Sequence, residues 1–150
     1  MRIHFWNLVF SVFFALLVLL GTQYLASNRL VFYDVPFRDL VLIALAIFRL
    51  VRLLSYDVIT QFIRDWFVGA PQDSLRHTLG MLVNCPWCTG LWFSFLVVFF
   101  YFAAPLFAWP IIIILALAAL ASLFQILANL IGWAAELKKM EVKTFETNIH

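Results

Sequence analysis

Long runs of apolar residues, separated by short polar stretches, occupy most of the chain. Residues 5–26 and 110–135 form two of these runs, and residues 38–55 and 88–107 form two more. A helix needs about 20 predominantly apolar residues to cross the hydrocarbon core of a bilayer. The pattern therefore predicts an all-α integral membrane protein, a single domain over residues 1–150 in which four spanning helices form a bundle.

The second run, residues 38–55, is the most polar of the four because it contains Arg49 and Arg52. We interpret it as a span whose arginines extend their long side chains toward the lipid headgroups. A re-entrant element, which enters and leaves the membrane on the same side, is the alternative interpretation.

Residues 56–68 have a different pattern, with apolar positions on one helical face and polar positions on the other. The apolar face consists of Val58, Ile59, Phe62, Ile63, Trp66 and Phe67. A helix of this kind lies in the membrane surface rather than across it. We predict an interfacial helix here, and a second short one over residues 74–83.

Two prolines mark the connection between the third and fourth spans. Pro105 and Pro110 bracket an uncharged segment, which we predict to be a tight turn near the membrane interface. Residues 138–150 follow the fourth span and are predicted to form a polar tail in water.

Composition supports a membrane protein and excludes other classes. The 150 residues are 65% hydrophobic and 12% charged, whereas soluble domains are typically about half apolar and about a quarter charged. A chain this small cannot bury so much apolar surface in its own interior, so the lipid bilayer is its predicted solvent. The net charge of +2 is too small to indicate binding to nucleic acid.

The basic residues predict an orientation. With four spans, both termini and residues 55–84 share one side, together with Arg2, Arg52, Arg64, Arg76, Lys138, Lys139 and Lys143. Arg29 and Arg38 fall on the other side. Cytoplasmic loops carry the excess of Lys and Arg. We therefore predict a multi-pass protein of a bacterial-type inner (cytoplasmic) membrane, with both termini in the cytoplasm.

The two cysteines stand together in the motif Cys85-Pro86-Trp87-Cys88-Thr89-Gly90, at the start of the third span. Pro86 suits the first position of a helix, so we expect Cys85 to cap that helix and Cys88 to lie one turn further on the same side. The helix dipole favours a thiolate at such a position. The spacing occurs in redox-active thiol enzymes and in zinc sites.

Three interpretations of the thiol pair remain open. In the redox interpretation, Cys85 attacks as a thiolate and Cys88 resolves, with a quinone beside Trp87 and Trp92. In the metal interpretation, zinc binds Cys85, Cys88 and His77, or both cysteines from each chain of a homodimer. In the third, both thiols only pack. Redox catalysis needs a further electron carrier, and a reducing cytoplasm opposes disulfide formation.

Arg49 and Arg52 are a second candidate pair, one helical turn apart. A charge within a span is costly and is therefore a functional candidate. We favour an anchoring role, in which these side chains reach the headgroups or pair with an acid such as Asp57. Contact with a lipid phosphate, a quinone or a partner subunit is the alternative.

Small and polar residues form a stripe along one face of the fourth span. The stripe consists of Ala118, Ser122, Gln125, Asn129 and Gly132. Small residues let helices approach closely in lipid, and amides form hydrogen bonds between them. We predict an internal packing seam, with a dimer interface or a ligand groove as alternatives.

Three segments together carry a family resemblance, namely residues 49–57, residues 62–64 and residues 85–92. With these segments the chain resembles a family of short bacterial and phage membrane proteins of no known function, which includes sporulation-associated YjcA-like proteins. The resemblance covers roughly residues 40 to 130, and the C-P-W-C-x-G block is its most specific part. It implies a compact membrane module and no particular reaction.

No Gly-rich phosphate loop, H-E-x-x-H or G-x-S-x-G motif occurs in the chain. The sequence therefore favours a non-catalytic accessory or assembly subunit, which binds another membrane protein or a second copy of itself. A thiol redox module and a metal-binding homodimer are the alternatives. Zinc and a quinone are the cofactor candidates that these alternatives imply.

Overall fold

The computed structural model describes residues 2–30, 35–71 and 74–149, with side chains over 5–30, 35–71 and 74–141. Every regular element in these residues is helical, which confirms the predicted all-α class. The elements are α1 (Arg2–Ser27), α2 (Phe37–Ser55), the 3-10 helix η1 (Val58–Thr60), α3 (Gln61–Phe67), α4 (Leu75–Asn84), α5 (Pro86–Ala103) and α6 (Pro105–Ile149).

The first apolar run forms α1, and local hydrogen bonds define its end. The N–H of Leu30 donates to the carbonyl of Leu25 at 2.9 Å, and the N–H of Arg29 donates to Ala26 at 3.1 Å. Arg29 has φ +54°, the left-handed conformation that this helix-ending motif requires. The chain therefore leaves α1 in a fixed direction, although the position is not a glycine.

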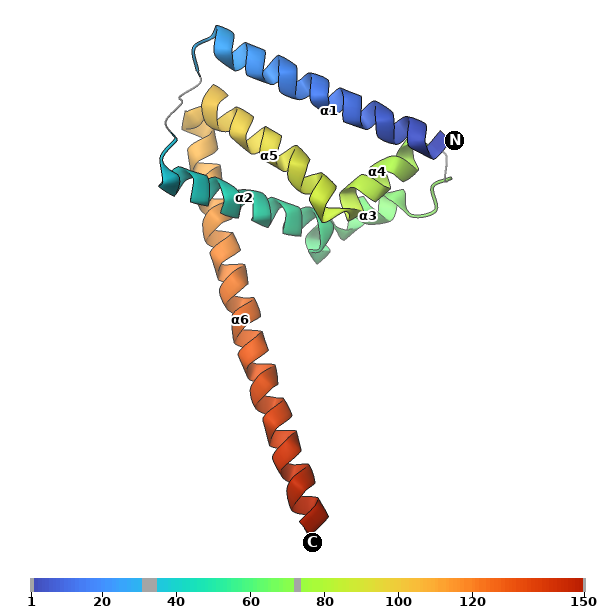
Figure 1. Ribbon diagram of the computed structural model, residues 1–150, viewed down its shortest axis with the longest axis vertical. Coiled ribbons are helices and arrows are strands. Elements are labelled where there is room, and N and C mark those ends of the chain that lie inside the picture. Colours follow the sequence, from blue (N-terminus) through green and yellow to red (C-terminus); the bar gives the residue numbers. More distant parts are fainter. Residues whose placement is uncertain (1, 31–34, 72–73, 150) are drawn as a thin grey trace.

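The helices are not arranged as a simple bundle. α5 packs between α1 and α2, whereas α6 packs on α2 and α5 with its first part only. The rest of α6 crosses the general direction of these helices and extends alone beyond the body of the molecule (Figure 1). The predicted four-helix bundle is therefore not confirmed.

The core lies where α2 meets the first part of α6. Ile43 and Ala46 of α2 are buried against Ala108 and Ile112 of α6. Ala46, and Ala116 and Ala119 further along α6, have no exposed surface. Alanines at these positions let the two helix backbones approach closely, because no larger side chain separates them.

Three helices are long and apolar enough to cross a membrane: Phe5–Ser27, Pro86–Ala103 and Pro105–Glu141. This confirms the membrane character that the sequence predicts. α2 has the predicted extent, but it contains Arg38, Asp39, Arg49 and Arg52 and is not one of the three. A fourth crossing by residues 38–55 therefore stays a prediction.

The predicted turn between Pro105 and Pro110 is wrong. The chain turns at Ala104, α6 begins at Pro105, and Pro110 lies inside the helix. Pro105 stands at the first position of α6, where a backbone N–H has no intrahelical partner. Pro110 lies one turn further and removes one backbone hydrogen bond, a loss that membrane helices tolerate. The predicted spans 88–107 and 110–135 accordingly become α5 and a much longer α6. The segment 138–149 continues α6 rather than leaving it.

The predicted interfacial helix over residues 56–68 is divided into η1 and α3. The hydroxyl of Thr60 donates to the carbonyl of Leu53 in α2. Arg64 donates to the carbonyl of Leu54 at 2.7 Å and to that of Asp57 at 2.9 Å. The carbonyls of Leu53 and Leu54 belong to the end of α2, and that of Asp57 precedes η1. The bonds therefore hold the chain in a sharp corner that one continuous helix could not make.

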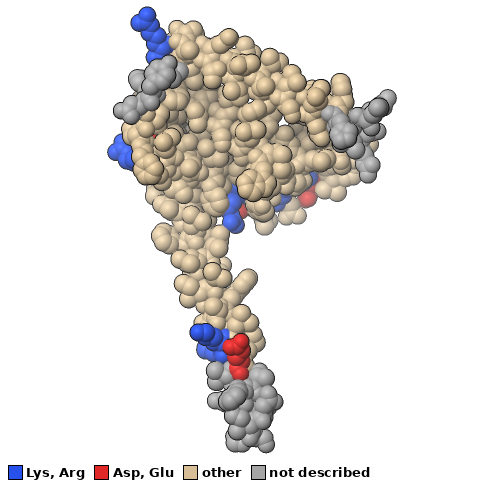
Figure 2. Space-filling model, viewed as in Figure 1, with Lys and Arg blue, Asp and Glu red and all other residues tan. Residues whose placement is uncertain are grey.

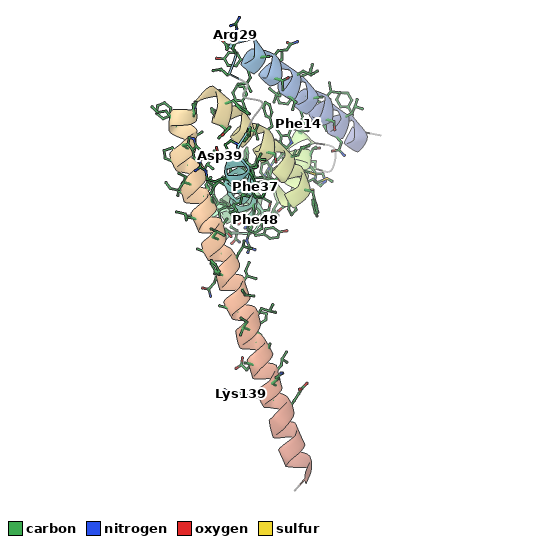
Figure 3. All side chains as sticks on the ribbon, turned by 60° about the vertical axis from the view of Figure 1, so that its left-hand side comes forward. Phe14, Arg29, Phe37, Asp39, Phe48 and Lys139 are labelled. Carbon is green, nitrogen blue, oxygen red and sulfur yellow. The ribbon has the colours of Figure 1, made fainter. Side chains whose placement is uncertain are left out.

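Charged side chains occupy the margins of the molecule. In the space-filling view, a wide uncharged surface separates the charged groups around the body from those on the far part of α6 (Figure 2). Among the labelled residues, Arg29 and Lys139 lie at opposite ends of the molecule (Figure 3). The uncharged stretches fit contact with acyl chains.

Candidate functional site

The cysteine motif begins α5 as the sequence predicts. Cys85 is the N-cap residue, with φ −99° and ψ 103°, and Pro86 occupies the first turn. The Cys85 Sγ accepts a hydrogen bond from the backbone N–H of Cys88 at 3.4 Å. No disulfide joins the two cysteines, and Cys88 lies one helical turn after Cys85.

Hydrogen bonds fix the corner that carries this motif. Thr89 is 2% exposed, and its hydroxyl donates to the carbonyl of Leu82 at the end of α4, at 2.8 Å. Ser55 at the end of α2 donates to the carbonyl of Val83 at 2.9 Å. The ends of α2 and α4 and the start of α5 are thereby held together, which positions the thiols precisely.

Both thiols line a cavity of about 430 Å³, which we call the thiol cavity. Residues of α1, α4 and α5 form its walls. They are Asn7, Phe10, Ser11, Phe14, Thr78, Met81, Leu82, Leu91 and Trp92, together with Cys85 and Cys88. The Phe14 and Trp92 rings meet edge to face, with centroids 4.9 Å apart, and Phe14 lies between α1 and the rest of the body (Figure 3).

The two thiols are not core residues. Cys85 is half-buried and Cys88 is exposed. A hydrogen bond with the Cys88 side chain, followed by one with the Cys88 backbone, lowers the pKa of the Cys85 thiol. Trp87, between them, is 89% exposed, whereas Trp92 lines the cavity. Both thiols therefore lie outside the tightly packed core, and their role stays a prediction.

His77 does not join the cysteines. It lines a separate cavity of about 450 Å³ with Arg64 and Asn84, whereas the thiol cavity contains neither of these nor His77. Within the described part of the chain, no three potential metal ligands of the His, Cys, Asp and Glu type gather in one place. A zinc site therefore stays a prediction.

The two arginines of α2 have different surroundings. Arg49 Nη1 forms an ion pair with Asp57 Oδ2 at 3.0 Å. The Arg52 guanidinium lies about 6 Å from the rings of Phe48 and Tyr56 (5.9 and 6.0 Å), and its Nε is buried without a hydrogen-bond partner among the described residues. Neither arginine lines the thiol cavity, so the structure does not unite the two predicted sites.

The stripe on the fourth span divides into two parts. Ala118 and Ser122 are half-buried, and Ser122 donates to the carbonyl of Ala118 at 2.8 Å. Gln125, Asn129 and Gly132 are exposed. The Gln125 amide donates to Asn129 Oδ1 at 3.1 Å. No residue in the described part of this chain covers them, so the expected internal seam does not extend over this part of α6.

Sequence analysis overlooked the contribution of α1 to the site. Asn7, Ser11 and Phe14 line the thiol cavity and recur at helical steps of four and three, which is the signal that could have revealed them. It also overlooked Asp39, which is 4% exposed and accepts a hydrogen bond from the Tyr101 hydroxyl at 2.8 Å. Only the packing of α5 against α2 brings these two together.

Comparison with known proteins identifies the relatives of this chain. The profile of a family described as "Protein of unknown function (DUF1360)" matches residues 69–128, a segment that includes the cysteine motif. "Sporulation protein YjcA" of Bacillus subtilis (strain 168) is 30% identical over 106 residues, 60% of this chain and 90% of that protein. The chain belongs to this family of unknown function. The predicted resemblance is thus confirmed.

A second relative is similar over much the same length. "UPF0713 protein YngL" of Bacillus subtilis (strain 168) is 32% identical over 100 residues, 59% of this chain and 77% of that protein. No solved structure matches the chain. Residues 49–57 and 62–64, the other two parts of the resemblance, lie outside the matched family segment.

Proposed function

We propose that this protein is a membrane association subunit that binds through the far part of α6. We call residues 120–141 of this helix distal α6. Its large apolar side chains are exposed along its whole length, among them Leu123, Phe124, Leu127, Leu130, Ile131, Trp133 and Leu137. Association by itself requires no chemistry, so this role corresponds to the non-catalytic subunit that the sequence favours.

The observation that carries this proposal is the length of the apolar part of α6. The apolar segment Pro105–Glu141 has 37 residues, which at 1.5 Å per residue makes a helix of about 55 Å. The hydrocarbon core is about 30 Å thick, and ordinary tilts lengthen the path through it only modestly. One crossing cannot place the whole segment in acyl chains, so part of its apolar surface must lie against protein. Residues 105–119 pack on α2 and α5, whereas distal α6 has no such cover among the described residues.

The amides of distal α6 favour a second copy as the partner. Gln125 and Asn129 bond to each other, which leaves an acceptor on Gln125 and a donor on Asn129 unused within this pair. Copies of one chain insert in the same direction, so a two-fold pair brings identical positions to the same depth. Amides that both donate and accept are self-complementary in such a pair, and Gly132 permits close approach.

Cysteine cross-linking in native membranes tests this proposal. In a chain with Cys85→Ser and Cys88→Ser, we introduce Gly132→Cys on the stripe or Leu127→Cys on the opposite face as the matched control. Mild oxidation is expected to give a disulfide-linked dimer with Gly132→Cys and at least five-fold less with Leu127→Cys. A Gln125→Leu, Asn129→Leu background is expected to weaken the cross-link.

Equal cross-linking of Gly132→Cys and Leu127→Cys would contradict the proposal. So would the absence of any cross-link in a protein that is monomeric in mild detergent. A product in which Gly132→Cys, but not Leu127→Cys, bonds to one defined membrane protein would replace the second copy with that protein as the partner.

We also propose the predicted location, a bacterial-type inner membrane with both termini in the cytoplasm. The support is the charge distribution, with Arg29 and Arg38 between the first two predicted spans and most other basic residues elsewhere. This orientation requires an even number of crossings and therefore a crossing by α2. Reporter fusions at residues 1 and 150 test it, since opposite locations of the two termini would contradict it.

A second candidate function, thiol redox chemistry, rests on a different observation. Cys85 and Cys88 line the thiol cavity, and Cys85 has a lowered pKa. This site lies on α4 and α5 rather than on distal α6, so one chain can carry both functions. Thiol–disulfide exchange tests it. Glutathione disulfide is expected to convert the pair to an internal disulfide, and failure to do so would contradict the redox role.

A further inference from the structure

We propose that the thiol cavity binds a quinone and that the dithiol of Cys85 and Cys88 reduces it to the quinol. This inference rests on the second proposed function, thiol redox chemistry, and assigns its substrate class. The geometry that points to it is the presence, in one cavity, of two free thiols, an aromatic wall and a set of polar side chains.

The size and walls of the cavity fit a flat, mostly apolar ring. Ligand sites are typically about 300–1,000 Å³, mainly apolar, with a few polar groups that fix orientation, and the thiol cavity measures about 430 Å³. Phe10, Phe14 and Trp92 supply aromatic surfaces on which a planar ring can stack or pack edge to face. Leu82 and Leu91 complete the apolar part.

Polar groups are available for the two oxygens of a quinone. Asn7, Ser11 and Thr78 line the same cavity as the thiols. The Ser11 hydroxyl donates to the carbonyl of Asn7 at 2.9 Å, whereas the amide N–H groups of Asn7 make no bond with another described residue. A quinone oxygen is purely an acceptor, so a side-chain amide donor is a suitable partner.

The position of the cavity favours a ligand that arrives from the membrane. Two of its walls, α1 and α5, are helices long and apolar enough to span the bilayer. Several lining residues are exposed, including Asn7, Ser11 and Leu91, so the cavity is not sealed. A water-soluble ligand would gain little from these walls, whereas a lipid-soluble quinone partitions into the phase that surrounds them.

The chemistry balances with the groups present. The Cys85 thiolate adds to a ring carbon of the quinone, which forms a C–S bond. The Cys88 thiolate then attacks the Cys85 sulfur, so the S–S bond forms, the C–S bond breaks, and its electron pair stays on the ring. The two thiol protons end on the two quinone oxygens. The dithiol is oxidised by two electrons and the quinone is reduced to the quinol.

Single-turnover oxidation of the full-length protein in detergent tests this inference. Duroquinone is a suitable probe, because its fully substituted ring disfavours a lasting thiol adduct. We expect one quinol, measured by absorbance, for each pair of thiols lost, measured by maleimide mass shift. Cys85→Ser and Cys88→Ser are each expected to abolish disulfide and quinol formation within one chain.

A bulky residue in the cavity distinguishes bound quinone from quinone in solution. Ser11→Phe fills the cavity from α1, and Thr22→Phe is its matched control. Thr22 is an exposed hydroxyl residue of α1 that also donates to the carbonyl four residues earlier, at 2.8 Å, but it does not line the cavity. Oxidation by duroquinone is expected to slow at least ten-fold in Ser11→Phe and to stay within two-fold in Thr22→Phe.

Asn7→Leu gives a second variant in case Ser11→Phe does not fold. In this variant, the duroquinone concentration that gives half the maximal oxidation rate is expected to rise at least five-fold. Oxidation by glutathione disulfide is expected to keep its wild-type rate. Equal rates of oxidation by duroquinone in the wild type, Ser11→Phe and Asn7→Leu would overturn the inference, because the reaction would then occur outside the cavity.

The outcomes also separate this inference from the function on which it rests. Oxidation by glutathione disulfide without any oxidation by duroquinone would overturn the quinone assignment and leave thiol redox chemistry intact. No oxidation by either reagent would contradict both. The purified protein could instead hold one zinc ion per two chains and lose it in Cys85→Ser. That result would overturn the quinone assignment in favour of a metal site shared between two copies.

Discussion

Cys85 combines two tasks in one residue. Its sulfur caps α5, since the Sγ accepts the N–H of Cys88 at 3.4 Å, and the same residue lines the thiol cavity. Hydrogen bonds with Cys88 lower the pKa of the Cys85 thiol, against a smaller opposing effect of burial. The capping N–H of Cys88 thus contributes to the lowered pKa, after the larger effect of the Cys88 side chain.

The pH dependence of alkylation at Cys85 follows from this pKa. Iodoacetamide reacts with the thiolate, so the rate at Cys85 is expected to rise with a midpoint below that of an ordinary cysteine. Cys88→Ala removes the largest cause of the lowered pKa and is expected to move the midpoint upward. Peptide mass spectrometry at a series of pH values measures this for Cys85 alone, and an unchanged midpoint would contradict the assignment.

The sign of the contribution that Cys85 by itself makes to stability follows from the same shift. Because the folded pKa of Cys85 lies below the unfolded pKa, the thiolate stabilises the fold at pH values above the unfolded pKa. This contribution is lost as the pH falls through the folded pKa.

Asp39 shows how one buried carboxylate is accommodated. It is 4% exposed and accepts hydrogen bonds from the Tyr101 hydroxyl at 2.8 Å and from Arg38 Nε at 3.1 Å. Burying a charged group is costly unless its hydrogen bonds are made. The contact also joins the start of α2 to the end of α5, far apart in sequence.

Tyr101→Phe is expected to destabilise the fold by about 1–3 kcal/mol, the usual cost of leaving a buried acceptor without its donor. Thermal unfolding in detergent measures the effect. Tyr24→Phe is the control, because Tyr24 is exposed, and it should leave the unfolding temperature nearly unchanged. Equal effects of the two variants would show that the Tyr101 hydroxyl does not matter.

At the scale of elements, close approach of helices sets the corner around the site. A Cβ at Gly80 of α4 would lie 2.8 Å from the Cβ of Phe67 in α3, a distance that real structures do not allow. A Cβ at Gly90 of α5 would lie 3.7 Å from Val51 Cγ2, an ordinary contact. The α3–α4 packing therefore requires glycine, whereas the start of α5 does not.

Gly80→Ala is accordingly expected to cost about 1–3 kcal/mol, as overpacking does, because the Cβ of Phe67 is fixed to its backbone and cannot rotate away. Gly90→Ala is expected to be neutral or slightly stabilising, since alanine is the better helix residue. Thermal unfolding of the two variants side by side measures the difference. A Gly80→Ala protein as stable as Gly90→Ala would refute this account of the corner.

At the scale of the whole molecule, the core and distal α6 are separate. The buried positions of α6 end at Ala119, and they pack on α2 and its neighbours. The remainder of the helix contributes apolar surface but no contact that holds the body together. Folding of the body and association through distal α6 should therefore be separable.

A chain that ends after Phe124 tests this separation. It is expected to keep the unfolding temperature of the body within a few degrees while losing the dimer that cross-linking detects. A chain that ends after Ile112 is the contrasting truncation, because it removes Ala116 and Ala119 from the α2 contact, and it should unfold at markedly lower temperature. Loss of folding in both truncations would contradict the separation.

The amount of structure that the sequence predicts differs between elements for a physical reason. α1, α2 and α5 were predicted closely because long apolar runs and Pro86 at a helix start act locally. The prediction for Pro105–Pro110 is wrong, because a proline can mark either the end of one helix or the beginning of the next. The division of residues 56–68 depends on bonds from Thr60 and Arg64 to α2, which no local pattern contains.

The candidate site divides in the same way. The sequence alone determined that Cys85 caps α5 with Cys88 one turn away, because a cap depends on neighbouring residues only. The tertiary structure decided that α1 lends Asn7, Ser11 and Phe14 to a cavity beside those thiols, and that His77 and the α2 arginines stay outside it. Helices that are apolar all round carry no pattern that specifies their neighbours, so packing alone selects which faces meet.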